Sequence, residues 1–138
     1  MPSSLFVNLP VQDVARSRAF FSALGFAFNP RFSSDQGICM VVNPQISVML
    51  LAKPFFQGFT PKPVADAHQS AQVLLALQCD SRAEVDDLVA RALAAGGSSS
   101  PQPEDLGFMY SHDFTDLDGH GWGPFVMTGA PPEAPTGP

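Results

Sequence analysis

Basic side chains are scarce in this sequence, and it has no long apolar run. Seven Lys and Arg residues stand against thirteen Asp and Glu, which gives a formal net charge of −6. A nucleic-acid backbone or an anionic membrane repels such a surface, so neither is expected as a partner. No apolar stretch is long enough to cross a bilayer. The first residues also lack the basic start and apolar core of a signal peptide, so a cytoplasmic location is expected.

Cysteine is rare as well. Cys39 and Cys79 are the two in the chain, and no CxxC or CxxH spacing around them indicates a metal site. We interpret both as buried small hydrophobic residues in a reducing compartment rather than as a disulfide or redox pair. What the sequence does contain is 45% apolar residues in a chain of 138, which suits one compact domain.

The first half of that domain, residues 4–52, has the pattern of a β-α-β-β-β module. Asp13 is a good N-cap for a helix, and Gly25 is placed to end it. Strand patterns cover residues 5–11, 26–28, 38–42 and 46–51. The following residues, 53–70, contain three prolines and no clear period. They are expected to form a connecting loop or an irregular helix that packs its aromatic side chains on the domain.

The pattern begins again in the second half, residues 71–128. A strand is predicted at 72–79, and Ser81 with Glu84 forms a capping box for a helix that ends at Gly96. Further strands are expected at 108–114 and 121–127. The domain is therefore assigned to residues 1–128. The tail, 129–138, has four prolines and is expected to be disordered.

The two halves align with each other. When Asp13 is matched to Ser81 as N-caps, Phe6 falls on Leu74 and Asn8 on Ala76, an offset of 68 residues. An internal duplication is therefore the central organisational inference. Each unit alone is too small to bury much core, so the two are expected to pair.

Both ends of the domain resemble a known superfamily. Residues 6–13, FVNLPVQD, with Phe20-Phe21 and Leu24-Gly25-Phe26 after them, resemble the opening of the vicinal oxygen chelate superfamily. Residues 114–122, FTDLDGHGW, resemble its D-P-D-G-H-x-W signature. Glyoxalase I, extradiol dioxygenases, fosfomycin-resistance enzymes and bleomycin-resistance proteins belong to it. The resemblance implies an α+β fold in which two β-α-β-β-β modules form a curved mixed sheet around a cleft, paired in a homodimer.

The resemblance also implies four metal-ligand positions in the cleft, and this sequence has replaced all of them. They correspond to Phe6, to Met49 or Leu51, to Leu74 and to Gly123. None of these residues supplies the oxygen or nitrogen donors that a divalent cation needs, and methionine sulfur is a poor ligand for hard ions. No metal or other cofactor is expected, and no reaction that uses the metal as a Lewis acid.

Seven residues are candidates for the cleft lining: Phe6, Asn8, Met49, Leu74, Tyr110, His112 and Trp122. Tyr110 and His112 lie two apart on one predicted strand, so they share a face that points into the cleft or to solvent. The Asn8 amide either holds a ligand or satisfies a backbone group. Trp122 either closes the core or lines the cavity.

The other two histidines are interpreted as structural or solvated. His120 is expected to tie the Asp-Gly-His turn to the sheet, and His68 to lie in solvent within the connecting loop. No Ser-His-Asp or Cys-His arrangement can be defined from the sequence, so no catalytic residue is assigned.

Two classes of function stay open. The first is a metal-free protein, similar to the bleomycin-resistance proteins, that binds a small organic molecule. Apolar replacements at the four ligand positions suit such a pocket. The second is an enzyme of the superfamily, such as a glyoxalase-like lyase, that uses side chains such as Tyr110 and His112 or a metal bound elsewhere.

Overall fold

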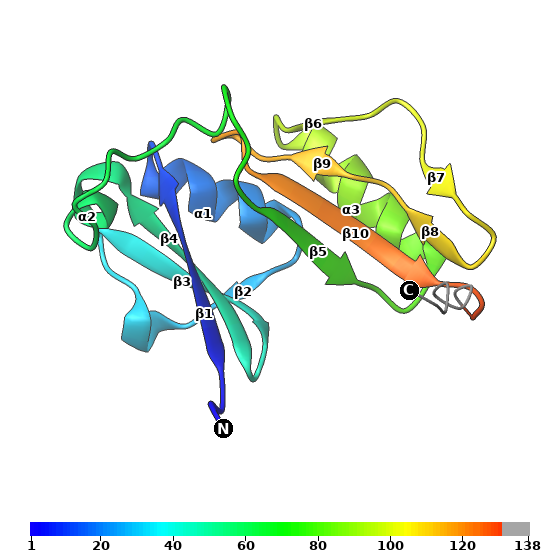
Figure 1. The fold of residues 1–138 in the computed structure, drawn as a ribbon, viewed down its shortest axis with the longest axis horizontal. Helices are drawn as coiled ribbons and strands as arrows, with labels where there is room; N and C mark the ends of the chain where they lie inside the picture. Colours follow the sequence, from blue (N-terminus) through cyan, green and yellow to red (C-terminus); the bar gives the residue numbers. More distant parts are fainter. Residues whose placement is uncertain (131–138) are drawn as a thin grey trace, which may run out of the picture.

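A computed structural model describes residues 1–130 and divides them into two halves that lie side by side (Figure 1). The predicted tail, 129–138, lies outside the described residues from 131 onward. The elements of the first half are β1 (Leu5–Val11), α1 (Val14–Ala23), β2 (Ala27–Phe28), the 3-10 helix η1 (Pro30–Phe32), β3 (Gly37–Asn43), β4 (Ile46–Ala52) and α2 (Lys53–Gln57). Those of the second half are β5 (Leu74–Gln78), α3 (Arg82–Ala94), β6 (Ser98–Ser99), β7 (Glu104–Asp105), β8 (Met109–Ser111), β9 (Phe114–Thr115) and β10 (Gly121–Met127).

Each half repeats the same connection between its first and last long strands. β1 pairs in parallel with β4, and β5 pairs in parallel with β10. The register places Asn8 opposite Met49 in the first half and Ala76 opposite Gly123 in the second. The predicted fold class, two β-α-β-β-β modules with mixed sheets, is therefore confirmed.

Both long helices begin and end as their sequences indicate. Asp13 accepts a hydrogen bond from the Arg16 N–H at 3.2 Å, and Ser81 accepts one from the Glu84 N–H at 3.1 Å. These side chains satisfy backbone donors that the first turn of a helix leaves open. After the helices, Gly25 and Gly96 adopt φ values of 98° and 106°, which disfavour a side chain.

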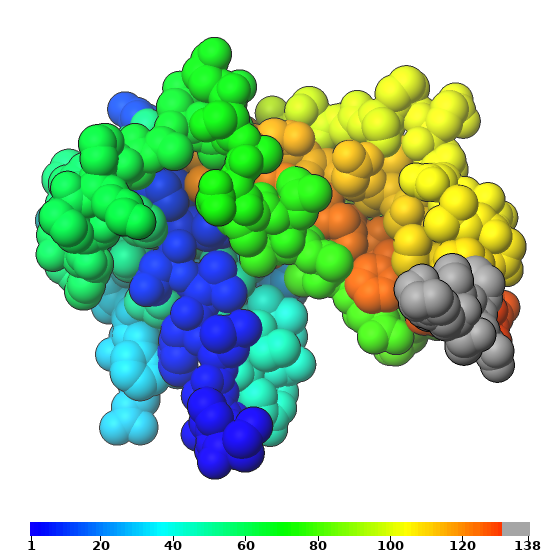
Figure 2. Space-filling model, in the orientation of Figure 1, coloured from blue at the N-terminus to red at the C-terminus, as the bar shows by residue number. Residues whose placement is uncertain are grey.

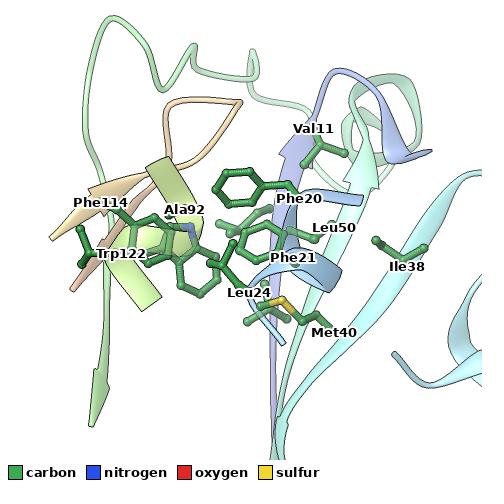
Figure 3. Close-up of a cluster of buried hydrophobic side chains, with 13 residues drawn as sticks. Val11, Phe20, Phe21, Leu24, Ile38, Met40, Leu50, Ala92, Phe114 and Trp122 are labelled. Carbon is green, nitrogen blue, oxygen red and sulfur yellow. The ribbon is translucent and has the colours of Figure 1, made fainter. Parts of the chain in front are cut away.

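The core lies where the helices of the two halves meet. α1 and α3 cover the same side of the strands, behind them in Figure 1. Phe21 from α1 packs against Trp122 from β10 with ring centroids 5.2 Å apart, and Phe114 stacks on Trp122 at 6.3 Å (Figure 3). All three side chains are at most 2% exposed. Because one cluster contains residues of both halves, neither half has a complete core of its own.

One predicted strand is divided in two. The pattern at 108–114 forms β8 and β9, which pair with β10 in the same antiparallel register on either side of His112. The residue opposite His112 in that register is Pro124. His112 donates its N–H to the Pro124 carbonyl at 3.2 Å, but proline has no N–H to return. The missing donor interrupts the ladder at this point.

Candidate functional site

A cavity of about 480 Å³ opens on the side of the sheets opposite α1 and α3, where the two halves adjoin. The end of β1, the turn before β10 and the start of β10 form its walls, and residues 64–73, which we call the cover, lie over it. In Figure 2 this green segment lies across the junction between blue β1 and orange β10. Its lining comprises Asn8, Leu9, Pro10, Phe56, Val64, Ala65, Ala67, Ser70, Ala71, Gln72, Val73, Leu74, Asp113, Phe114, Thr115, Gly119, His120, Gly121, Trp122 and Gly123.

The alternation of β1 places Asn8 in the cavity. Leu9 and Val11 are buried against the core, so the residues between and before them face the other side. Within residues 1–130, the Asn8 side-chain amide has no hydrogen-bond partner. It therefore offers both a donor and an acceptor to a molecule in the cavity.

Gly123, near the start of β10, leaves open space in the opposite wall. A Cβ at Gly123 would have no neighbour closer than the Ala76 Cα at 4.0 Å. At Gly121, by contrast, a Cβ would lie 2.8 Å from Leu74 Cδ2, so the leucine side chain uses that space. The Gly-Trp-Gly sequence thus sets a tryptophan into the core and leaves open space on the other face.

The Asp-Leu-Asp-Gly-His turn joins the halves at the edge of the cavity. His120 Nε2 lies 2.7 Å from the Pro10 carbonyl oxygen, so this nitrogen carries the proton and donates it. Asp118 Oδ1 accepts the Gln12 N–H at 2.7 Å, and Asp118 Oδ2 lies 3.4 Å from the donating Ser17 hydroxyl. The structural interpretation of His120 fits this geometry.

Asp116 organises the same turn from inside. Its carboxylate accepts hydrogen bonds from the Trp122 indole at 2.9 Å and from the N–H groups of Asp118 and His120 at 2.9 and 3.0 Å. Burial raises the pKa of the Asp116 carboxyl above its usual value of 3.8, although the hydrogen bonds from Trp122 and the backbone and the charge of His120 act in the opposite direction. The hydrogen bonds of Asp116 hold the turn against the start of β10.

The electrostatic character of the lining is neutral to slightly acidic. Asp113 is its one carboxylate, and it accepts a hydrogen bond from the Ser100 hydroxyl at 2.6 Å. No lysine or arginine is present among the lining residues of the described chain. Most of the wall is apolar, and its other polar groups are amides, hydroxyls and the tethered His120.

The structure brings three of the seven sequence candidates into this cavity. They are Asn8, Leu74 and Trp122, the last of which lies in the core cluster as well. Phe6 lies outside the lining and packs edge-on against Phe32, with ring centroids 6.1 Å apart. Met49, half-buried on β4, is also outside it.

Tyr110 and His112 lie elsewhere in the second half. The Tyr110 hydroxyl donates to Asp86 Oδ1 at 2.6 Å, and the Arg82 guanidinium lies 4.7 Å from the centre of its ring. The bond to Asp86 raises the pKa of the Tyr110 hydroxyl. His112 Nε2 donates to the Ser100 carbonyl at 2.6 Å. Neither side chain lines the cavity.

The residues at the four implied metal positions do not fit a metal. Phe6, Leu74 and Gly123 have no side-chain donor atom, and Met49 offers only a thioether. Residues 1–130 contain no group of three or more His, Cys, Asp and Glu side chains that could hold a metal ion. Cys39 and Cys79 are free and buried, and burial raises the pKa of the Cys79 thiol to about 12. Its thiolate, the form that binds metals, is therefore suppressed.

Sequence reasoning missed most of the cavity wall. Residues 64–74 have no periodic pattern, and their contribution depends on where the chain crosses between the halves. The closely spaced Gly121 and Gly123 were a signal in the sequence, because two glycines on one face of a strand leave space there.

No helix in the described part of the chain is long and apolar enough to span a membrane.

Comparisons with known proteins find a family model and a solved structure of more than 30% identity. The bleomycin resistance protein-like N-terminal family model matches residues 3–43. A hypothetical protein from S. aureus is 32% identical over 91% of this chain and 95% of its own, with a TM-score of 0.78. No match is found among curated proteins.

More distant solved structures share the fold. A glyoxalase/bleomycin resistance protein/dioxygenase family enzyme from Burkholderia phytofirmans PsJN is 19% identical over 88% of this chain and 96% of its own, with a TM-score of 0.73. A fosfomycin resistance protein from Listeria monocytogenes is 22% identical over 93% and 96%, with a TM-score of 0.66.

Proposed function

This chain belongs to the vicinal oxygen chelate superfamily, and we propose that within it the protein binds a small organic molecule without a metal. The observation that carries the proposal is the cavity, whose wall is mainly apolar and has open space at Gly123. Its volume of about 480 Å³ is within the range of about 300–1,000 Å³ found for small-molecule sites.

The lining selects among ligands by charge. Entering the cavity removes an anionic ligand from water, and the wall offers it the carboxylate of Asp113 but no lysine or arginine as a partner. Burying an unpaired charge in this way is energetically costly. A neutral ligand avoids this cost, and a cationic ligand can offset it by pairing with Asp113. We infer a mostly apolar, neutral or cationic molecule that exchanges hydrogen bonds with the Asn8 amide.

A matched series of compounds tests this function. Thermal unfolding is measured with naphthalenemethanol, naphthylmethylamine and naphthoate, which share a ring system and differ in charge. The alcohol and the amine should raise the melting temperature, because a ligand at about 100 times its Kd stabilises the native state by about 2.7 kcal/mol. Naphthoate should not. Absence of any response across a wider panel of neutral and cationic aromatic compounds would overturn the proposal.

A variant shows whether such binding occurs in this cavity. Gly123→Met places a long side chain in the open space and reproduces the residue at the equivalent position of β4. It should abolish the ligand-induced shift while the unliganded melting temperature is kept or raised, since a strand glycine is entropically costly. Ser111→Met is the control, because Ser111 lies outside the lining. Binding that survives Gly123→Met would contradict the assignment of the site.

The enzymatic alternative has a direct test. Purified protein is examined by elemental analysis and assayed with methylglyoxal and glutathione in the presence of Zn²⁺, Ni²⁺ or Co²⁺. We expect neither stoichiometric metal nor turnover, because the four implied positions lack suitable donors. Stoichiometric metal together with turnover would replace the binding proposal.

The predicted homodimer is also part of the proposal. Within residues 1–130, β1 and β5 each pair on one side only. Apolar side chains near these edges are exposed, with Phe6 at 47% and Leu74 at 77%. A second copy would cover such surfaces. Light scattering after size exclusion should give twice the mass of the chain, and a monomer at micromolar concentration would refute the dimer.

A further inference from the structure

Alternate residues of the cover border two different cavities. Ala65 and Ala67 line the apolar cavity, whereas Asp66 and His68 line a polar cavity of about 350 Å³ on the other side. The alternation means that residues 65–68 separate two spaces rather than fill a core. Displacing this segment would widen the entrance of the apolar cavity.

Hydrogen bonds do not attach the cover to the sheets. The N–H groups of Gln69 and Ser70 donate to the Asp66 carbonyl, and the His68 N–H donates to the Asp66 carboxylate. Nearer to α2, the Gln57 amide donates to the carbonyls of Thr60 and Lys62. Within the described chain every hydrogen bond of residues 61–73 is thus local to the segment or its neighbour α2. Segments held in this way open at a low free-energy cost.

The cover lies in close contact with a glycine of the turn. A Cβ at Gly119 would lie 2.6 Å from the His68 nitrogen and 2.7 Å from the Ala67 carbonyl carbon. Backbone therefore contacts backbone at this point, and any side chain at 119 would force the segments apart. Because Asp116 and Asp118 fix the turn on the domain, the cover is the part that would move.

We propose that residues 64–73 are a cover whose displacement widens the entrance of the cavity for the ligand, and that Gly119 is the residue that positions it. The entry role rests on the proposed binding function. The contact at Gly119 does not, and it can be tested without a ligand.

Two asparagine variants separate the contact from the backbone conformation. Gly119 and Gly107 both have a φ of 88°, but a Cβ at Gly107 meets nothing within 4 Å. Asparagine tolerates positive φ better than other residues with a side chain. Gly119→Asn therefore adds the collision, and Gly107→Asn adds only the conformational cost. Ala67→Gly is a second variant, which makes the backbone of the cover more flexible and leaves the turn unchanged.

The first measurement is limited proteolysis with proteinase K, with the cleavage sites mapped by mass spectrometry. Gly119→Asn should raise the rate of cleavage within 61–73 by about tenfold, with a smaller rise for Ala67→Gly, because cleavage follows the population of the open form. Gly107→Asn should leave that rate unchanged. Equal cleavage in the two asparagine variants would overturn the contact.

The second measurement follows entry of the neutral dye Nile red by stopped-flow fluorescence. An opened cover should increase both the association and the dissociation rate constants in Gly119→Asn, whereas Gly107→Asn should change neither. Faster cleavage without faster dye exchange would overturn the entry role. A wild type that binds no neutral or cationic probe would overturn the proposed function and entry together, while the contact at Gly119 would still be decided by proteolysis.

Discussion

The two halves of this chain have the same connections but present different surfaces on the side opposite α1 and α3. Met49 on β4 and Gly123 on β10 occupy equivalent register positions, opposite Asn8 and Ala76. The methionine is half-buried and outside the cavity, whereas the glycine borders open space within it. The open space of the cavity therefore lies where the second half has a glycine and the first half has a methionine side chain.

The residues that face the helices differ much less in character. Val48 and Leu50 on β4 and Trp122 and Val126 on β10 are all buried and apolar. Because successive strand residues face opposite sides, one set of positions maintains the fold while the alternate set is free to change the site. A duplicated frame can in this way acquire a pocket in one half without losing its core.

The largest expected effect comes from breaking the contact that joins the halves. Phe21→Ala removes the ring that packs on Trp122 and should lower the free energy of unfolding by about 3–5 kcal/mol. Urea unfolding is followed by Trp122 fluorescence and by circular dichroism. Since the core is shared, both signals should change at the same urea concentration. Separate transitions would show that the halves unfold independently. Phe59→Ala is the control, because this side chain is exposed and its removal should change the free energy of unfolding little.

The next largest effect is expected when the buried carboxylate of Asp116 is replaced, a group of the second half that has no counterpart in the first half. Asp116 accepts the Trp122 N–H on one oxygen and two backbone N–H groups on the other. In Asp116→Asn, either orientation turns an NH₂ group toward buried donors. The free energy of unfolding should fall by about 1–3 kcal/mol, measured by urea denaturation. An unchanged stability would remove Asp116 from its structural role.

The dependence of this loss on pH has a definite sign. Because burial raises the pKa of Asp116 above 3.8 in the folded chain, the folded state binds the proton more tightly than the unfolded state. The resulting stabilisation is complete below the unfolded value and is lost as pH rises through the folded value. The advantage of the wild type over Asp116→Asn should therefore be larger at acidic than at neutral pH. An advantage that shrinks on acidification would contradict the raised pKa.

The sequence was informative about the frame and much less about the cavity. N-caps, helix-ending glycines and strand alternation are local signals, and they are sufficient to predict the duplicated modules. Alternation tells which residues share a face but not which face meets the helices, so Tyr110 was a cleft candidate although α3 supplies its partner Asp86. The cover, residues 64–73, has no local signal because non-local packing determines its course.

A smaller effect is expected at the two N-caps, where the halves should behave alike. Asp13→Ala and Ser81→Ala each remove one side-chain acceptor of a helical N–H, at 3.2 and 3.1 Å. Each should lower the free energy of unfolding by about 1 kcal/mol, measured by urea denaturation. Asp13→Ser and Ser81→Asp exchange the caps and serve as controls that should cost much less. A loss confined to one helix would show that the halves rely on their caps differently.

The smallest effect concerns an ion pair that distinguishes α3 from α1. Arg91 Nε lies 2.8 Å from Asp87 Oδ2, one helical turn apart with the acid nearer the N-terminus, while no residue of α1 enters an ion pair within residues 1–130. Both side chains are half exposed, so a double-mutant cycle with Asp87→Asn and Arg91→Gln should give about 0.3–0.5 kcal/mol. Because salt screens exposed charges, this coupling should vanish in about 1 M NaCl. A coupling energy that persists in salt would mean that the pair stabilises α3 by more than a half-exposed ion pair should. The two helices would then differ in how they are stabilised, and not only in their surface charges.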